Sequence, residues 1–223
     1  AHSIKKRNVR NKDLDKNDWG KPNTLNVSAL FFVPAILGYL EGERTLIPVE
    51  YTVTKEVVIA APPAEVWKQL THINDLKESE KHASLSNFMG FPRHLRTVAD
   101  TFSVGGTRFA VYEKGLYFKE TISEYVPNKR MVLDIKTDPD NIPPTVMDEH
   151  ILIGGKHLDI LKDEYNVEQL PNGSSRLSLA SRFRINTPLN WYAGLWAHYL
   201  MSDILVGELN LVKTRATKAG DKS

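Results

Sequence analysis

The chain has 223 residues and a formal net charge of only +2, from 29 Lys and Arg against 27 Asp and Glu. So small a charge argues against a broad basic surface, and nucleic acid is not expected as a partner. The sequence contains no cysteine, which excludes disulfides, thiolate metal sites and thiol nucleophiles. Its length suits one large domain, or one domain of ordinary size with an extension.

Residues 1–48 are expected to form an N-terminal extension in which residues 4–26 mix both charges and carry little apolar material. The apolar stretch at 29–40, ALFFVPAILGYL, is about half the length that crosses a bilayer and contains Pro34 and Gly38. Two interpretations stay open: a short helix or strand packed on the domain, or a membrane-proximal remnant that tethers a soluble domain. The sequence favours no compartment and no oligomeric state.

The first strand is predicted at about 51–60, where β-branched residues precede Pro62 and Pro63, which cannot donate to a strand ladder. Helical spacing begins at once, with Val66, Trp67 and Leu70 on one face of a helix at 63–71. A second short helix is predicted at 73–82.

Further strands are predicted from alternating or β-branched runs at 108–115, 116–126, 131–138, 158–170 and 175–185. The last two flank PNGS, a strong hairpin signal. The connection at 138–157 is long and irregular, which is typical of a lid or rim. A helix of roughly 28 residues is predicted to begin near Thr187 and Pro188, and a tail follows at 218–223.

This order predicts an α+β domain at 49–217, in which a curved antiparallel sheet wraps around the long C-terminal helix. The two short helices after the first strand would close one end. The terminal helix carries a broad apolar stripe, which is predicted to be covered by the sheet with a hollow between them. Its members are Trp191, Tyr192, Leu195, Trp196, Tyr199, Leu200, Ile204, Leu205, Leu209 and Val212.

Three segments resemble the START-like helix-grip superfamily (SRPBCC), which includes polyketide cyclases, lipid-transfer domains and plant pollen-allergen proteins. They are VVIAAPPAEVWKQLTHI at 57–73, GTRFAVYEKG with ETISEYVPNKRMVLDI at 106–135, and DEYNVEQLPNGSSRLSL at 163–179, leading into the final helix. A narrower likeness, to START-like domains that follow membrane spans in bacterial proteins, is carried by FMGFPRHLR, KHLD and SDILVGEL. The resemblance implies an apolar or amphipathic ligand in the cavity, but no shared reaction.

Strand alternation and the helix stripe together predict the lining of this cavity. The expected ligand-binding residues are Phe118, Glu120, Ile122, Leu133, Tyr165, Val167, Leu179, Phe183, Trp191, Leu195, Trp196 and Tyr199. For the aromatic residues of the helix, stacking on a planar ligand and ordinary core packing both stay open.

Glu120 is the charged member of an otherwise apolar strand face. If it points inward, its charge must be paired or its pKa raised, as in a general acid or a ligand anchor. The alternative is that a twist turns it to solvent, or that Lys119 or Arg130 pairs with it. Tyr165 and His198 are further weak catalytic candidates.

No metal and no cofactor are expected, because the spacing of His150, His157 and Asp159 matches no metal motif. The function predicted is binding of a lipid, isoprenoid or aromatic, polyketide-like molecule in an internal cavity, for transport or sensing. Two alternatives stay open. One is a cyclase or dehydratase using Glu120, and the other is an interaction module with a collapsed cavity.

Overall fold

The computed structural model describes residues 47–73, 76–77, 80, 84–88, 90–137 and 157–220. The strands are β1 (Val49–Ile59), β2 (His94–Ala99), β3 (Thr107–Tyr112), β4 (Tyr117–Val126), β5 (Arg130–Lys136), β6 (Leu158–Gln169) and β7 (Ser175–Ile185). The helices are α2 (Pro63–Thr71), α3 (Leu85–Phe88) and α4 (Asn190–Gly220), and a 3₁₀ turn, η2 (Glu113–Gly115), joins β3 to β4.

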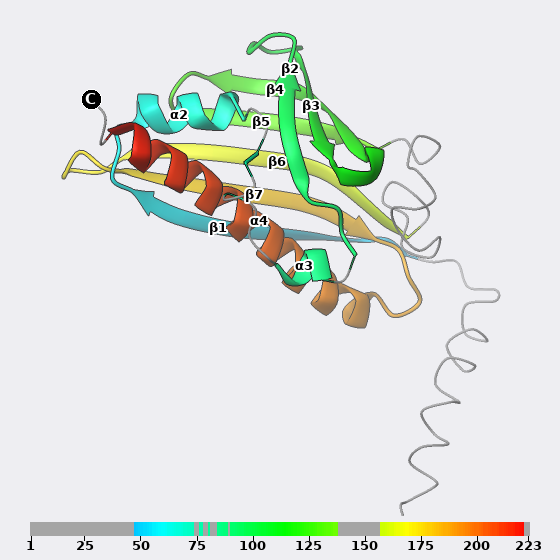
Figure 1. Ribbon diagram of the computed structural model, residues 1–223. Helices are drawn as coiled ribbons and strands as arrows, with labels where there is room; N and C mark the ends of the chain where they lie inside the picture. Colours follow the sequence, from blue (N-terminus) through cyan, green and yellow to red (C-terminus); the bar gives the residue numbers. More distant parts are fainter. Residues whose placement is uncertain are drawn as a thin grey trace, which may run out of the picture. The chain divides into compact units, whose positions relative to one another are not determined.

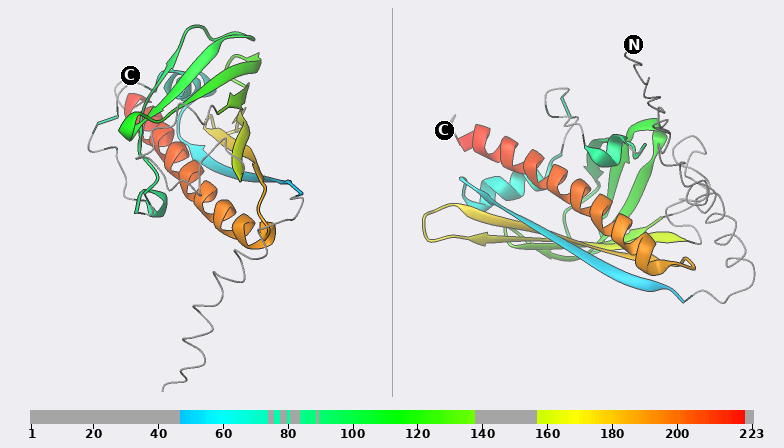
Figure 2. Two further views of the ribbon diagram at one scale, coloured as in Figure 1. Left: turned by 90° about the vertical axis from the view of Figure 1, so that its right-hand side faces the viewer. Right: turned by 90° about the horizontal axis from the view of Figure 1, so that it is seen from below.

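All seven strands form one antiparallel sheet with the order β1-β7-β6-β5-β4-β3-β2. Strands β2 to β7 follow one another as a meander. The last strand, β7, pairs with the first, β1, along its whole length, from Val49 opposite Ile185 to Ile59 opposite Ser175. The sheet curves around one side of α4 (Figures 1 and 2). The predicted α+β helix-grip arrangement is therefore confirmed.

The break after β1 forms as the two prolines predict. Pro62 is extended and caps α2, and Pro63 occupies the first turn, where its missing N–H is not needed. Val66, Trp67 and Leu70 are buried, and the indole N–H of Trp67 donates to the Tyr125 hydroxyl at 3.1 Å. These contacts hold α2 against the same core as α4.

The segment between α2 and β3 differs from the prediction. Ile73, Leu76 and Lys77 are not helical, and the second short helix instead lies at Leu85–Phe88. Strand β2 was not predicted. Its sequence, HLRTVA, is short and partly charged, which is how edge strands avoid pairing with other chains, so it gives a weak strand signal.

The prediction that the sheet covers the whole apolar stripe of α4 is wrong for the first half of the helix. Trp191, Leu195, Trp196 and Tyr199 are between 46% and 67% exposed. Here the helix instead turns Ala193, Gly194 and Ala197 toward the sheet. The reason is a close approach: a Cβ at Gly194 would lie 2.6 Å from the ring of Tyr51 on β1.

From Met201 onward α4 buries large side chains. Leu205, Leu209 and Val212 join one core cluster with residues of α2, β1 and β4 to β7. Inward-facing positions alternate along the strands, and burial confirms the predicted inward direction of Phe118, Glu120, Ile122, Leu133, Tyr165, Val167, Leu179 and Phe183. The buried residues that continue the same alternation are Leu116, Met131, Ile135, Leu177, Ser181 and Ile185.

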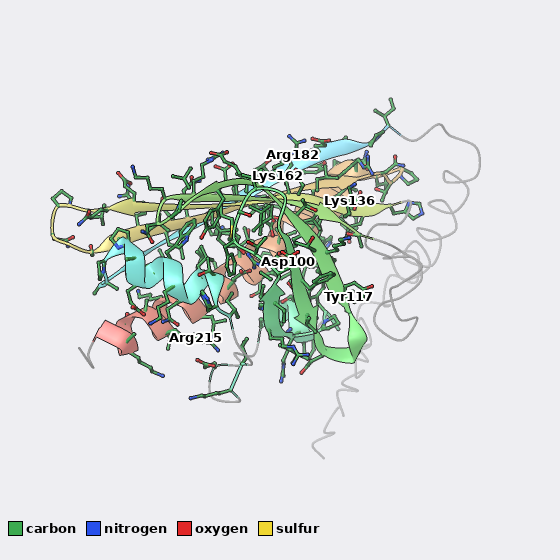
Figure 3. All side chains as sticks on the ribbon, turned by 90° about the horizontal axis from the view of Figure 1, so that it is seen from above. Asp100, Tyr117, Lys136, Lys162, Arg182 and Arg215 are labelled. Carbon is green, nitrogen blue, oxygen red and sulfur yellow. The ribbon has the colours of Figure 1, made fainter. Side chains whose placement is uncertain are left out.

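The outer face of the sheet carries charged side chains, among them Lys162 and Arg182 (Figure 3). Lys162 pairs with Asp134, and Arg182 pairs with Glu50. No helix within the described residues is long and apolar enough to span a membrane. The extension at 1–46, with its apolar stretch, and the passage at 138–156 lie outside the described residues, so their predicted roles and the predicted domain boundaries stay predictions.

Candidate functional site

A cluster of ionisable side chains lies where the sheet faces α4, and we call it the charge cluster: Arg108 on β3, Glu120 on β4, Asp163 and Tyr165 on β6, and Glu208 on α4. Arg108 and Glu120 face each other across paired positions of β3 and β4, and Nε of Arg108 lies 3.0 Å from Oε2 of Glu120. Both side chains are at least 95% buried. Glu120 therefore points inward, and its partner is neither Lys119 nor Arg130.

Glu208 connects the cluster to α4. Its Oε1 accepts a hydrogen bond of 2.5 Å from the Tyr165 hydroxyl and lies 3.9 Å from Nη2 of Arg108. The guanidinium also lies over the ring of Tyr165, with 5.5 Å between Cζ and the ring centroid. One cation is thus shared by two carboxylates and an aromatic face.

Burial raises the pKa of Glu120 to about 8, against the opposing effect of Arg108, while Asp163 and Glu208 add to the rise. Burial likewise raises the pKa of Asp163 to about 7, although a hydrogen bond with Ser181 opposes it. Burial disfavours the charge of Arg108, but Glu120, Tyr165 and Glu208 hold its pKa above the ordinary value. The cluster therefore keeps its cation, while Glu120, and in part Asp163, hold their protons near neutral pH.

Not every polar atom of the cluster is satisfied. Among the described residues, Nη1 of Arg108 and Oδ1 of Asp163 are buried without a hydrogen-bond partner. The close contact of Arg108 with Glu120 is an ion pair whose atoms do not align as a hydrogen bond. Such groups are costly to bury, which marks the region as more than a packing core.

A pocket with a volume of about 110 Å³ lies beside this cluster, between α3, β2, β3 and α4. Its apolar wall consists of Leu76, Phe91, Pro92, Ile204 and Leu211. Its polar groups are Glu80, Ser84, Ser86, Asn87, Arg93, His94, Tyr112, Asp203 and Glu208. Glu208 therefore belongs to both the pocket wall and the charge cluster.

The aromatic rings at the wall are packed against one another. The ring centroids of His94 and Tyr112 are 5.1 Å apart, and those of Tyr112 and Phe91 are 5.8 Å apart. Burial lowers the pKa of His94, so its imidazole is neutral at pH 7. Burial raises the pKa of Tyr112, so its phenol keeps its proton.

Two polar contacts fasten the segment around α3 to α4 and so fix the pocket rim. The backbone N–H of Ser86 donates to Oδ2 of Asp203 at 2.9 Å. Arg215 binds Glu80 through two hydrogen bonds, of 2.9 and 2.8 Å, and this pairing lowers the pKa of Glu80 to about 2. The rim is thus held by charged contacts that span more than a hundred residues of sequence.

Among the described residues, the pocket is lined by none of the twelve predicted ligand-binding residues. Eight of them, Phe118, Glu120, Ile122, Leu133, Tyr165, Val167, Leu179 and Phe183, are buried. Four, Trp191, Leu195, Trp196 and Tyr199, lie on the exposed face of α4. The expected hollow between the sheet and α4, and ligand contact by these twelve residues, therefore stay predictions.

The catalytic candidates are separated by the fold. Glu120 and Tyr165 lie in the charge cluster, whereas His198 is exposed on α4. Of the residues weighed as metal ligands, His157 contacts the carbonyl of Asn186 through Nδ1 at 2.9 Å, and Asp159 pairs with Arg184 at 3.1 Å. His150 lies outside the described residues.

Sequence reasoning missed Arg108, Asp163 and Glu208, and also His94 and Tyr112 in the pocket wall. A signal was present for two of them. Arg108 has the same strand parity as buried Ala110, and Glu208 lies between the buried Leu205 and Leu209 of α4. A charged residue at an inward position is the pattern that could have identified both.

A scan of protein-family models finds no match, and a search of curated proteins finds no relative. Several solved structures are similar in fold. A START superfamily protein from Mycobacterium smegmatis has 12% identity and a TM-score of 0.49, over 75% of this chain and 98% of that one. An uncharacterized protein from Rhizobium leguminosarum has 16% identity and a TM-score of 0.44, over 78% and 99% of the two chains.

A protein from Nitrosospira multiformis has 12% identity and a TM-score of 0.40, over 70% of this chain and 94% of that one. At these identities the likeness concerns the fold and says nothing about a ligand. The architecture itself, a seven-stranded antiparallel sheet curled around a long C-terminal helix with short helices after the first strand, is a helix-grip arrangement.

Proposed function

We propose that this domain binds a small amphipathic molecule in the pocket between α3, β2, β3 and α4. The observation that carries the proposal is the composition of the wall, in which apolar side chains such as Phe91 and Ile204 lie beside polar groups, among them Tyr112 and Glu208. Ligand sites commonly combine an apolar lining with a few polar groups that orient the ligand.

The volume limits the size of the ligand. A pocket of about 110 Å³ is smaller than the roughly 300–1,000 Å³ typical of sites for drug-sized molecules. A single-ring compound suits it better than a long-chain lipid or isoprenoid. Of the ligand classes that the sequence predicts, the aromatic molecule is therefore favoured over the lipid and the isoprenoid. Reversible binding is compatible with both transport and sensing.

The geometry favours binding over the cyclase or dehydratase alternative. Glu120 is only 4% exposed and, in the described part of the chain, lies behind the pocket wall rather than in it. Its raised pKa therefore reflects burial in the charge cluster more directly than contact with a substrate.

The test uses the full chain and a panel of single-ring compounds, with binding followed by ligand-observed NMR. Gly207 lines the pocket, and a Cβ added there would meet no described atom within 4 Å, so Gly207→Leu places a side chain in the pocket. Val206→Leu, at a neighbouring position that is 43% exposed, is the matched control.

We expect compounds that bind the wild type and Val206→Leu to lose affinity for Gly207→Leu by at least tenfold. Thermal unfolding of all three proteins shows whether the variants remain folded. Failure of the whole panel to bind, or equal binding to a folded Gly207→Leu variant, would overturn the proposal.

A further inference from the structure

Glu208 has one carboxylate oxygen occupied and one available. Its contacts with Tyr165 and Arg108 both involve Oε1. Within the described residues, neither of these contacts uses Oε2, and the side chain is 16% exposed at the pocket wall. The hydrogen bond from Tyr165 therefore fixes the orientation of a carboxylate that still has a free acceptor for a ligand.

The charged groups around the pocket leave an excess of negative charge. The described lining includes Glu80, Asp203 and Glu208 against one guanidinium, Arg93, which is exposed. Glu80 is neutralised by its bidentate pair with Arg215. Of the described lining, Asp203 and Glu208 then face one cation, Arg93, at the mouth.

The cation behind Glu208 compensates it only in part. Arg108 lies 3.0 Å from Glu120 but 3.9 Å from Glu208, and it is 2% exposed, so it offers no surface to a ligand. An anionic head group in the pocket would lie next to Glu208, with Arg108 screened behind it. Like charges at such short range are unfavourable in a partly buried site.

The ring walls also favour a cation. Tyr112 and Phe91 line the pocket, and aromatic rings can attract a positive charge through their quadrupoles, while the neutral imidazole of His94 adds no repulsion. On these grounds we propose, resting on the function above, that the pocket selects small single-ring amines, whose protonated nitrogen binds Oε2 of Glu208 while the ring lies against Phe91, Ile204 and Leu211.

The experiment compares three probes with the same ring and different head groups: benzylamine, benzyl alcohol and benzoate. Dissociation constants are measured at pH 7 by NMR titration of the full chain. We expect benzylamine to bind at least tenfold more tightly than benzoate, with benzyl alcohol between them.

Glu208→Gln is the informative variant, because its amide oxygen can still accept from Tyr165 while the charge is lost. It should weaken benzylamine binding by about tenfold or more and change benzyl alcohol binding by less than threefold. Glu168→Gln on β6, whose side chain is 65% exposed, makes the same change in net charge away from the pocket and should change neither.

Equal affinity for the three probes, tighter binding of benzoate, or an unaltered benzylamine affinity in a folded Glu208→Gln variant would overturn the amine assignment. Each of these outcomes would still leave the pocket function intact, provided that Gly207→Leu abolished binding. Loss of binding by every probe to the wild type would instead overturn both proposals.

Discussion

Replacing Arg108 by Met should destabilise the domain strongly, and more so at alkaline pH. The side chain is 2% exposed and is the cation of the charge cluster, so Arg108→Met leaves Glu120 and Glu208 without it. Removing one partner of a buried ion pair costs about 3–5 kcal/mol. A typical domain has a total stability of only about 5–15 kcal/mol, so the effect should be large.

The pH dependence follows from Glu120. In the wild type its pKa is about 8, and Arg108 acts to lower it. Without Arg108 this pKa rises further, so the folded variant must either keep the proton or bury an unpaired carboxylate. Below pH 7 the carboxyl is mostly protonated in both proteins, and the difference between them is smaller. Each unit by which the pKa rises adds up to about 1.4 kcal/mol to the penalty at high pH.

The assay is urea denaturation, followed by tryptophan fluorescence and far-UV circular dichroism at pH 6 and pH 9. We expect a penalty of about 3–5 kcal/mol at pH 9 that is lower by at least about 1 kcal/mol at pH 6. Arg108→Met combined with Glu120→Met should recover part of the loss, since apolar side chains can replace a buried ion pair at little cost.

Arg182→Met is the control for loss of a cation. Arg182 pairs with Glu50 on the outer face, where both side chains are about half exposed, so its loss should cost at most about 1 kcal/mol. A penalty for Arg108→Met below about 1 kcal/mol, or one that does not change between pH 6 and pH 9, would refute the assignment of a structural ion pair.

Three further predictions concern stability. Gly207→Ala should stabilise α4 by up to about 1 kcal/mol, because its Cβ enters open space. Gly194→Ala should instead cost about 1–3 kcal/mol, because its Cβ meets a tyrosine ring of β1. Urea denaturation measures both changes in the free energy of unfolding. Because the pKa of Glu120 is raised in the folded state, its contribution to stability is complete below the ordinary pKa of 4.5 and is lost as the pH rises through about 8. Urea midpoints should therefore fall from pH 5 to pH 9, and they should fall less in Glu120→Gln. Leu205→Ala should cost about 2–5 kcal/mol, while Trp196→Ser, on the exposed face, should change the free energy of unfolding by less than about 0.5 kcal/mol in the same assay.

Much of the fold could be predicted because its signals are local. Two prolines after a β-branched run can end β1 and begin α2 whatever lies elsewhere in the chain. Strand parity similarly identified the inward positions of β4 to β7. The orientation of α4 was different, because its first half is apolar on two faces. A Gly-Ala face can approach β1 closely and an aromatic face cannot, but the partner that decides between them is a tyrosine about 140 residues earlier.

The candidate site depends on contacts that sequence spacing does not encode. Arg108 and Glu120 are twelve residues apart, but Glu208 meets them only because α4 crosses the sheet at this point. Seen alone, Glu208 is one of several polar residues of α4, and Arg108 is one cation in a strand. Their parity could have predicted inward charges, but not that one cation would be shared.

The charge cluster also explains why the pocket lies near β2 and β3, at one edge of the sheet, rather than between the centre of the sheet and α4. Arg108, Tyr165 and Glu208 fill the space between β3, β6 and the middle of the helix, where an apolar ligand would have to displace ion pairs and hydrogen bonds. On the other side of Glu208 the wall includes the apolar side chains of Phe91, Ile204 and Leu211, and Glu208 is the group that faces both regions. A ligand that binds Glu208 must therefore act on Arg108 as well, because neutralising this carboxylate leaves more of the guanidinium charge to Glu120. Ligand binding and protonation of the buried acid are thus linked through one shared cation.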